Sequence, residues 1–293
     1  MSTLLFISNG ADAQKNYMGG GFINYKDDVP ILTPIYKEGD NIKYDVIAFD
    51  VSNQSFEILK EGINGRTEII FYHDDTYTVA ALKKESGRQV VYTKAGETHP
   101  VAISQQTANM IGMMNGHGIR INDKGEFFYF ADQQGKVAGK FSLEKGLMAE
   151  YPLDDPMGGT PIFDGKYMHY FPTGAFNGLK VTVLDVQTQT SEPWPFKIDG
   201  GFSIHSSYIP LAEGKGAIFR YSNAPYVYDA AKKNFKKLDL DLDRQGLSKF
   251  FISKNRDLLY SVNIVDGNIK LEEVSFLGGT FDLSWEDING GSE

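Results

Sequence analysis

The sequence predicts an all-β fold assembled from six similar units, and three observations carry that prediction. Aromatic residues make up 13% of the 293 residues, and Phe and Tyr favour strands. Glycine recurs at the start of six comparable stretches, about 45 residues apart. Most of these stretches contain an apolar segment, a polar turn and a second, aromatic-rich segment, as in "GTPIFDGKYMHYF". This pattern is typical of repeated antiparallel hairpins.

The repeat length points to one architecture. A period of about 45 residues is typical of a β-propeller blade, which has four strands. We therefore predict a single domain over residues 1–293, folded as a six-bladed β-propeller, with seven blades as the alternative. The units begin at Gly21, Gly65, Gly118, Gly159, Gly201 and Gly246. The predicted blades span residues 20–62, 65–104, 118–153, 159–198, 201–241 and 246–288.

Each of these glycines is interpreted as the point where the chain crosses from the outer edge of one blade to the innermost strand of the next. Room for a β-carbon is small there, and a positive φ suits glycine best. We expect the first strand of each blade to begin just after its glycine. The longest interval, between Gly65 and Gly118, holds an insertion before His117.

The second half of three units shares a further pattern. An apolar strand ends in an aspartate, whose side chain can brace the turn that follows, and the next strand carries an aromatic residue that covers the seam between sheets. The pairs are Asp50 with Phe56, Asp185 with Trp194, and Asp229 with Phe235. These hairpins resemble the third and fourth strands of kelch and related propeller repeats. The resemblance covers three or four hairpins and implies a propeller, without identifying a family within that class.

A ring of blades needs a closing strand, because an unpaired sheet edge invites aggregation. Two segments compete for this role. Residues 3–8 precede the first glycine and have no blade of their own, and residues 279–288 follow the last apolar strand. The sequence leaves both alternatives open.

Composition narrows the range of partners. The formal net charge of −9 disfavours binding to nucleic acid or anionic membranes. Cysteine is absent, which excludes disulfides, thiolate nucleophiles and cysteine-based metal sites, and we expect neither a cofactor nor a metal. The sequence contains no run of 18 apolar residues, so we expect no membrane insertion. The apolar stretch 4–7 is too short for a convincing signal peptide. The compartment stays open between the cytoplasm and a virion or cell surface.

The histidines are the main candidates for chemistry, because none of the common catalytic motifs is present in the sequence. His73 and His99 are predicted to be exposed, and His169 to pack within a blade. His117 and His205 lie close to their glycines, so we place them at the channel mouth where the inter-blade loops converge. The predicted ligand or partner site contains Arg66, Asn115, His117, Asp155, Thr160, Asp199, Ser203 and His205.

The favoured function is a non-enzymatic binding or structural propeller. Its loop rim would engage a protein or glycan partner, with Tyr17, Phe176 and Phe202 as aromatic anchors. A larger assembly such as a virion tail or surface complex is one setting for such a protein. The alternative is a lyase or hydrolase with its site at the channel mouth. There His117 or His205 would act as the base, and Arg66 would stabilise an anionic intermediate. A sugar-binding lectin is disfavoured because the units diverge too much.

Overall fold

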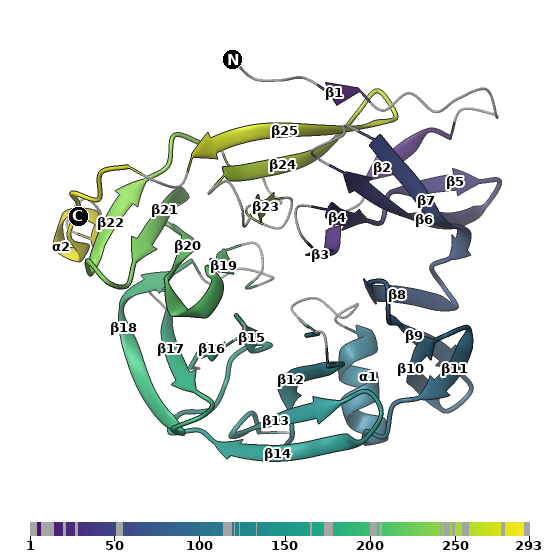
Figure 1. Cartoon of the computed structure of the whole chain (residues 1–293), viewed down its shortest axis with the longest axis horizontal. Coiled ribbons are helices and arrows are strands. Elements are labelled where there is room, and N and C mark those ends of the chain that lie inside the picture. Colours follow the sequence, from purple (N-terminus) through teal and green to yellow (C-terminus); the bar gives the residue numbers. More distant parts are fainter. Residues whose placement is uncertain are drawn as a thin grey trace. The chain divides into compact units, whose positions relative to one another are not determined.

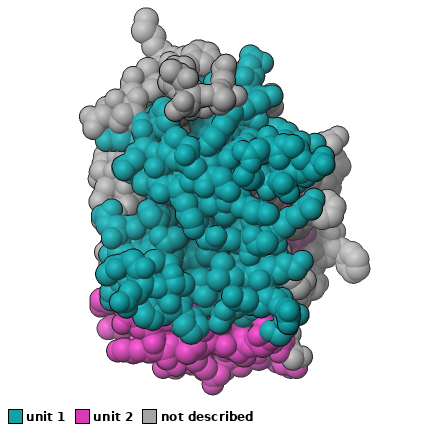
Figure 2. All heavy atoms as spheres, turned by 90° about the vertical axis from the view of Figure 1, so that its right-hand side faces the viewer, with its two compact units in different colours: residues 1–100, 108–116, 249–278 teal, residues 101–107, 117–248, 279–293 magenta. Residues whose placement is uncertain are grey.

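A computed structural model shows an all-β chain (Figure 1), whose strands group into two compact units (Figure 2). The first unit contains residues 1–100, 108–116 and 249–278, and the second contains the remainder. The structure describes residues 5–6, 15–19, 22–26, 29–50, 55–113, 119, 121–122, 124–132, 134–164, 166–172, 178–199, 204, 207–240, 242, 247, 250–253, 258–276 and 279–289.

The first unit holds three antiparallel sheets. The largest has six strands: β2 (Tyr17–Gly19), β5 (Ile35–Glu38), β6 (Asn41–Asp50), β4 (Val29–Leu32) and β3 (Phe22–Lys26) in that order, with β7 (Ser55–Asn64) paired to β6. The next is formed by β8 (Glu68–His73), β9 (Thr78–Lys84), β10 (Gly87–Lys94) and β11 (Glu97–Pro100). The third has the order β1 (Leu5–Phe6), β25 (Asn268–Phe276), β24 (Leu258–Val265) and β23 (Phe250–Ser253).

The second unit also holds three antiparallel sheets. The first consists of β12 (Glu126–Phe130), β13 (Val137–Ser142) and β14 (Gly146–Pro152). The second consists of β15 (Ile162–Phe163), β16 (Tyr167–Tyr170), β17 (Leu179–Asp185) and β18 (Thr190–Ile198). The third consists of β19 (Tyr208–Pro210), β20 (Gly216–Tyr221), β21 (Ala224–Asp229) and β22 (Asn234–Lys237). Six sheets of sequence-adjacent antiparallel strands make the fold class a six-bladed β-propeller, as the repeat predicts.

Helix in the described part of the chain consists of α1 (Gln105–Met113), α2 (Trp285–Asn289), the 3₁₀ turn Ala212–Gly214 and single 3₁₀ residues at Ile204 and Leu247. α1 lies in the predicted insertion. Its start is capped by the Ser104 hydroxyl, which accepts a hydrogen bond from the Thr107 amide at 3.1 Å. The Asn109 side chain accepts the Arg88 amide at 2.8 Å, which fastens the helix to the β9–β10 hairpin.

Strand starts follow the glycines at four of the six positions. β3, β8, β15 and β23 begin within four residues after Gly21, Gly65, Gly159 and Gly246 respectively. After Gly201 the first strand among the described residues is β19, which begins at Tyr208, and residues 201–203 and 205–206 lie outside the described part. After Gly118 the prediction was wrong for the described residues. Ile119 and Ile121 are buried but form no ladder, and that sheet has three strands.

The predicted aspartate turns are present where the structure describes them. The Asp185 Oδ1 accepts the amides of Gln187 and Thr188 at 2.8 and 3.0 Å. The Asp229 Oδ1 accepts those of Ala231 and Lys232, both at 3.0 Å. These bonds satisfy turn amides that no ladder reaches. The turn after Asp50 lies outside the described residues.

The cores lie between neighbouring sheets within each unit. Phe235 of β22 is buried and packs with its ring centroid 5.8 Å from that of Phe196 in β18, so it covers the seam between two sheets as predicted. In the first unit, Tyr17, Tyr36 and Phe49 pack against Phe251 and Tyr260 of the sheet that contains β24.

The two terminal segments have different roles. β1 pairs antiparallel with β25, with Leu5 opposite Leu271, and forms the outer strand of its sheet. Leu283 instead bridges Phe235 of β22, and the chain then turns into α2. Of the two candidates, the N-terminal segment therefore extends the last sheet in the sequence.

Candidate functional site

Four of the eight predicted site residues are described by the structure. Arg66 and Asp155 are exposed, as a binding residue should be, whereas Thr160 is buried. Asn115, His117, Ser203 and His205 lie outside the described residues. Arg66 belongs to the first unit and the other three described residues to the second, so their grouping into one site stays a prediction.

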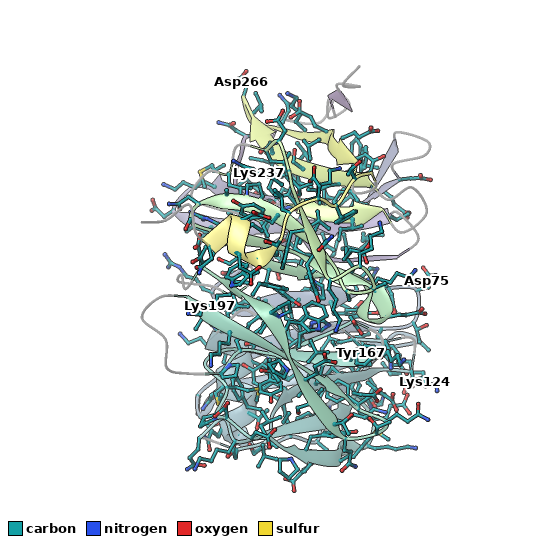
Figure 3. The ribbon with its side chains drawn as sticks, turned by 90° about the vertical axis from the view of Figure 1, so that its left-hand side faces the viewer. Asp75, Lys124, Tyr167, Lys197, Lys237 and Asp266 are labelled. Carbon is teal, nitrogen blue, oxygen red and sulfur yellow. The ribbon has the colours of Figure 1, made fainter. Side chains whose placement is uncertain are left out.

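Asp199 has a structural role. Its carboxylate accepts the amides of Ser222 and Asn223 at 2.8 and 3.1 Å, and it forms an ion pair with Arg220 at 3.2 Å. Ser222 and Asn223 both have positive φ, so Asp199 braces the strained β20–β21 turn of the neighbouring sheet. Figure 3 shows Lys197, just before Asp199, on the opposite side of the second unit from Tyr167 and Lys124.

A buried polar network joins two sheets of the second unit. The His169 Nε2 lies 3.0 Å from the Asp164 Oδ2, and the Tyr208 hydroxyl lies 2.7 Å from the His169 Nδ1. His169 is in β16 and Tyr208 in β19, so the network crosses from one sheet to the next. The ring of Trp194 contacts His169 edge-on, with centroids 5.2 Å apart. As predicted, His169 packs inside the structure with no solvent exposure.

The Asp164 carboxylate is saturated by four hydrogen bonds. Besides His169, it accepts the amides of Lys166, Tyr167 and Gly214 at 2.9, 2.7 and 2.7 Å. Burial alone would raise the pKa of Asp164, but the bonds from His169 and from these amides outweigh it and lower the pKa.

The order Tyr–His–Asp has the connectivity of a nucleophile, a base and an orienting acid. The Tyr208 side chain is fully enclosed, and burial raises the pKa of its phenol well above the usual value. A substrate cannot reach a nucleophile without solvent exposure, and this one is held in its protonated form. The network is therefore a brace between sheets.

A second buried network lies in the first unit. The Asp45 side chain in β6 is fully buried and accepts hydrogen bonds from the Lys15 ammonium at 2.8 Å, the Tyr17 hydroxyl at 2.9 Å and the Gly62 amide at 2.9 Å. Lys15 also pairs with the exposed Glu61 at 2.8 Å and lies over the Tyr36 ring. This network is open to water on one side, because the Lys15 side chain is 26% exposed.

The two charged ends of that network stabilise each other. Burial alone would lower the pKa of Lys15, but its hydrogen bonds to Asp45 and Glu61 outweigh that effect and raise the pKa. Burial and the adjacent Asp45 carboxylate raise the pKa of Tyr17. The prediction that Tyr17 is an exposed loop anchor was wrong, because Tyr17 lies in β2 and is only 4% exposed. Its hydroxyl donates a hydrogen bond to the buried Asp45 carboxylate, which holds the side chain inside the unit. Phe176 and Phe202 lie outside the described residues.

The sheet with six strands carries a feature that the repeat does not require. β5 and β2 extend one end of β6, away from β3 (Figure 1). Ile35 lies opposite Tyr44, and Lys37 opposite Ile42, so these four residues share one face of the extension. Ile35 and Ile42 are 36% and 44% exposed. Met18, 51% exposed, lies in the irregular part of β2 beside Ile35. We refer to Met18, Ile35, Lys37 and Ile42 as the extension face.

The other described histidines have ordinary roles. His73 was predicted to be exposed, but it is half-buried and its Nδ1 lies 2.8 Å from the Thr78 hydroxyl, so burial lowers its pKa. His99 is exposed as predicted and lies on the outer strand β11. Among the described residues, no group of three or more His, Asp or Glu side chains is arranged to hold a metal ion. Within the same residues, no helix has the length and hydropathy needed to cross a membrane.

Comparisons with known proteins identify no family for this chain. No family model matches the chain, and no curated protein matches it, so the kelch-like character of the hairpins stays a prediction. Among solved structures, the β-propeller domain of the trilobed protease from Pyrococcus furiosus is 10% identical, with 85% of this chain and 78% of that chain covered and a TM-score of 0.48.

Two further solved structures are similar at the same level. A putative 6-phosphogluconolactonase from Bacteroides uniformis is 14% identical, with 87% and 81% coverage and a TM-score of 0.43. TolB from Acinetobacter baumannii is 11% identical, with 84% of this chain covered and a TM-score of 0.42, and the present chain spans only 51% of its length. At such identities and TM-scores, these likenesses carry no information on activity, substrate or partner.

Proposed function

We propose that this chain is a non-enzymatic binding propeller that engages a protein partner. The observation that carries the proposal is the extension face, where exposed Met18 and Ile35 on the added strands β2 and β5 lie beside exposed Ile42 at the start of β6. Exposed apolar side chains cost solvation free energy when they remain in water, and clusters of them mark interaction surfaces. β2 and β5 bury Tyr17 and Tyr36 on one face, which fixes these strands in place, and the opposite face is left to present Ile35 to a partner.

The composition of the extension face favours protein over glycan. Sugar rings are commonly held by stacking on aromatic faces, whereas the apolar residues here are aliphatic. The aromatic residues of this region, Tyr17, Tyr36 and Tyr44, are all buried. A larger assembly, such as the virion tail or surface complex predicted from the sequence, is one setting for this module. The loop site around His117 and His205 stays a separate prediction.

Affinity capture from the native source tests the proposal. Three baits are used: the parent chain, Ile35→Thr/Ile42→Thr and Ile58→Thr. Threonine keeps the β-branched shape that suits a strand, so all three should fold. Ile58 is a matched control, because it is 39% exposed on the same sheet but lies opposite Ile47, on the face that carries Tyr36.

A partner protein should be recovered by the parent chain and by Ile58→Thr, and lost with the double variant. Equal recovery of the same proteins by all three baits would contradict the proposed surface. Turnover of a small molecule by the purified parent chain, abolished by His117→Ala/His205→Ala, would instead support the enzymatic alternative.

A further inference from the structure

We infer that the partner presents an acidic, amphipathic segment to the extension face, an inference that rests on the function proposed above. The extension face combines aliphatic side chains with positive charge, although the chain as a whole carries a formal net charge of −9. A local cationic and apolar surface on an acidic protein is complementary to a segment that is both acidic and apolar.

Lys37 supplies the first positive charge. It lies opposite Ile42 in the β5–β6 register and is exposed. The neighbouring carboxylate of Glu38 is engaged by Lys43, and both of these side chains project from the opposite side of the hairpin, since Lys43 lies opposite Tyr36. Among the described residues, the Lys37 ammonium has no ion-pair partner.

Arg66 supplies the second positive charge, at the other side of Tyr44. Gly65 lies against the Tyr44 ring, and the Tyr44 hydroxyl accepts the Ile70 amide at 2.7 Å, which holds the start of β8 beside the sheet. Arg66 follows Gly65 in the turn and is exposed. The carboxylate in the next strand, Glu68, is engaged by Lys60 at 2.8 Å. Within the described part of the chain, the Arg66 guanidinium also lacks an ion-pair partner.

These charges argue against a second copy of this chain as the occupant. A two-fold dimer through the extension face would bring Lys37 and Arg66 of both copies into one interface, and the repulsion between these like charges would disfavour it. An acidic segment of another protein would instead place carboxylates at these cations and aliphatic side chains against Ile35 and Ile42. The two cations would then form ion pairs at the rim, around an apolar centre.

Panning a random peptide phage library on the immobilised full-length chain tests the inference. Enriched peptides should combine Asp or Glu with Leu, Ile or Phe. The affinity of a labelled enriched peptide is then measured by fluorescence anisotropy. We expect Lys37→Glu/Arg66→Glu and Ile35→Thr/Ile42→Thr each to weaken binding by about tenfold or more.

Two matched variants control for general effects. Lys83→Glu/Lys124→Glu changes the net charge by the same amount at two exposed lysines elsewhere, and Ile58→Thr removes an equally exposed isoleucine from the other face. Both should bind the peptide as the parent does. Rising salt should weaken binding to the parent, because the ion pairs at the rim are screened.

Enrichment of basic or uncharged peptides, or no enrichment, would overturn the inference, as would an equal loss of binding in Lys83→Glu/Lys124→Glu. The two proposals fail separately. If a captured native partner is lost with Ile35→Thr/Ile42→Thr but kept by Lys37→Glu/Arg66→Glu, protein binding stands and the acidic segment is wrong. If both double variants retain the partner, the extension face is wrong as well.

Discussion

Asp45 in the first unit and Asp164 in the second are both carboxylates without solvent exposure, but they are stabilised in different ways. Asp164 lies at a turn and is surrounded by three backbone amides and one histidine. Asp45 lies within a strand and depends on Lys15, which reaches it from 30 residues earlier in the sequence. The position of Asp164 is therefore set mainly by its own turn. The ion pair of Asp45 with Lys15 instead holds the N-terminal segment that contains Lys15 against β6.

The largest effect should come from removing the more saturated carboxylate. Asp164→Ala leaves three amides and the His169 Nε2 without an acceptor in a buried site, and we expect a loss of about 4 kcal/mol in the free energy of unfolding. Urea unfolding followed by fluorescence measures this loss. Asp155→Ala, at an exposed position, is the control and should change little. A loss below about 1 kcal/mol would show that water replaces the carboxylate.

Removing the cation from the other network should have a smaller effect. Lys15→Met leaves Asp45 with the Tyr17 hydroxyl and the Gly62 amide, and we expect a loss of about 2 kcal/mol, because Lys15 is already partly hydrated. Lys60→Met is the matched control, since Lys60 is half-exposed in its pair with Glu68 and such a pair is worth at most about 1 kcal/mol. Similar losses of unfolding free energy in both variants would show that the pair of Lys15 with Asp45 stabilises the fold no more than an exposed ion pair does.

Deleting one hydroxyl from each network compares them directly. Tyr208→Phe leaves the His169 Nδ1 unpaired in a closed site and should cost about 2 kcal/mol. Tyr17→Phe should cost about 1 kcal/mol, because Asp45 keeps its charged partner. Thermal unfolding of the two variants, measured side by side, gives the difference. If Tyr17→Phe lost more stability than Tyr208→Phe, the network around Asp45, and not the one around His169, would be the one more closed to water.

The pH dependence of stability gives the smallest and most specific signal. The pKa of Asp164 is lowered in the folded state, so its contribution to stability is fully present above the ordinary carboxyl pKa of about 4 and is lost as the pH falls through the folded value. Asp164→Asn should therefore lose less stability than the parent chain on acidification from pH 6 to below pH 4. Parallel curves of melting temperature against pH would contradict this.

The sequence was sufficient for the fold because the repeat is local. Aspartates at strand ends, such as Asp185 and Asp229, and seam aromatics such as Phe235 act within one hairpin or between neighbouring ones. Where a unit departs from the repeat, prediction failed. The stretch after Gly118 has the apolar alternation of a strand, with Ile119 and Ile121 buried, but no ladder partner within the described residues.

The candidate surface was missed for a related reason. "VPILTPIYKEGDNIKY" contains the signal for an added strand, because a second apolar segment and a Gly-containing turn follow Pro34 within one predicted blade. The face on which Ile35 would be exposed depends on its register with Tyr44, and register is decided by pairing in space. Arg66 was predicted to bind a ligand or partner at a loop rim, whereas the proposal above places it beside the extension face; neither role is tested by the structure.

The pairing of β1 with β25 has a consequence for synthesis. β1 leaves the ribosome long before its partner strand, because Leu271 follows Leu5 by most of the printed sequence. At translation rates of 5–20 residues per second, β1 waits for roughly 15 to 50 s before that strand exists. During this interval the earlier blades have time to form, while the N-terminal strand stays without its final neighbour. The sheet that contains β25 can therefore be completed only late in synthesis, and this joining of two distant segments is the step that a chaperone would influence most.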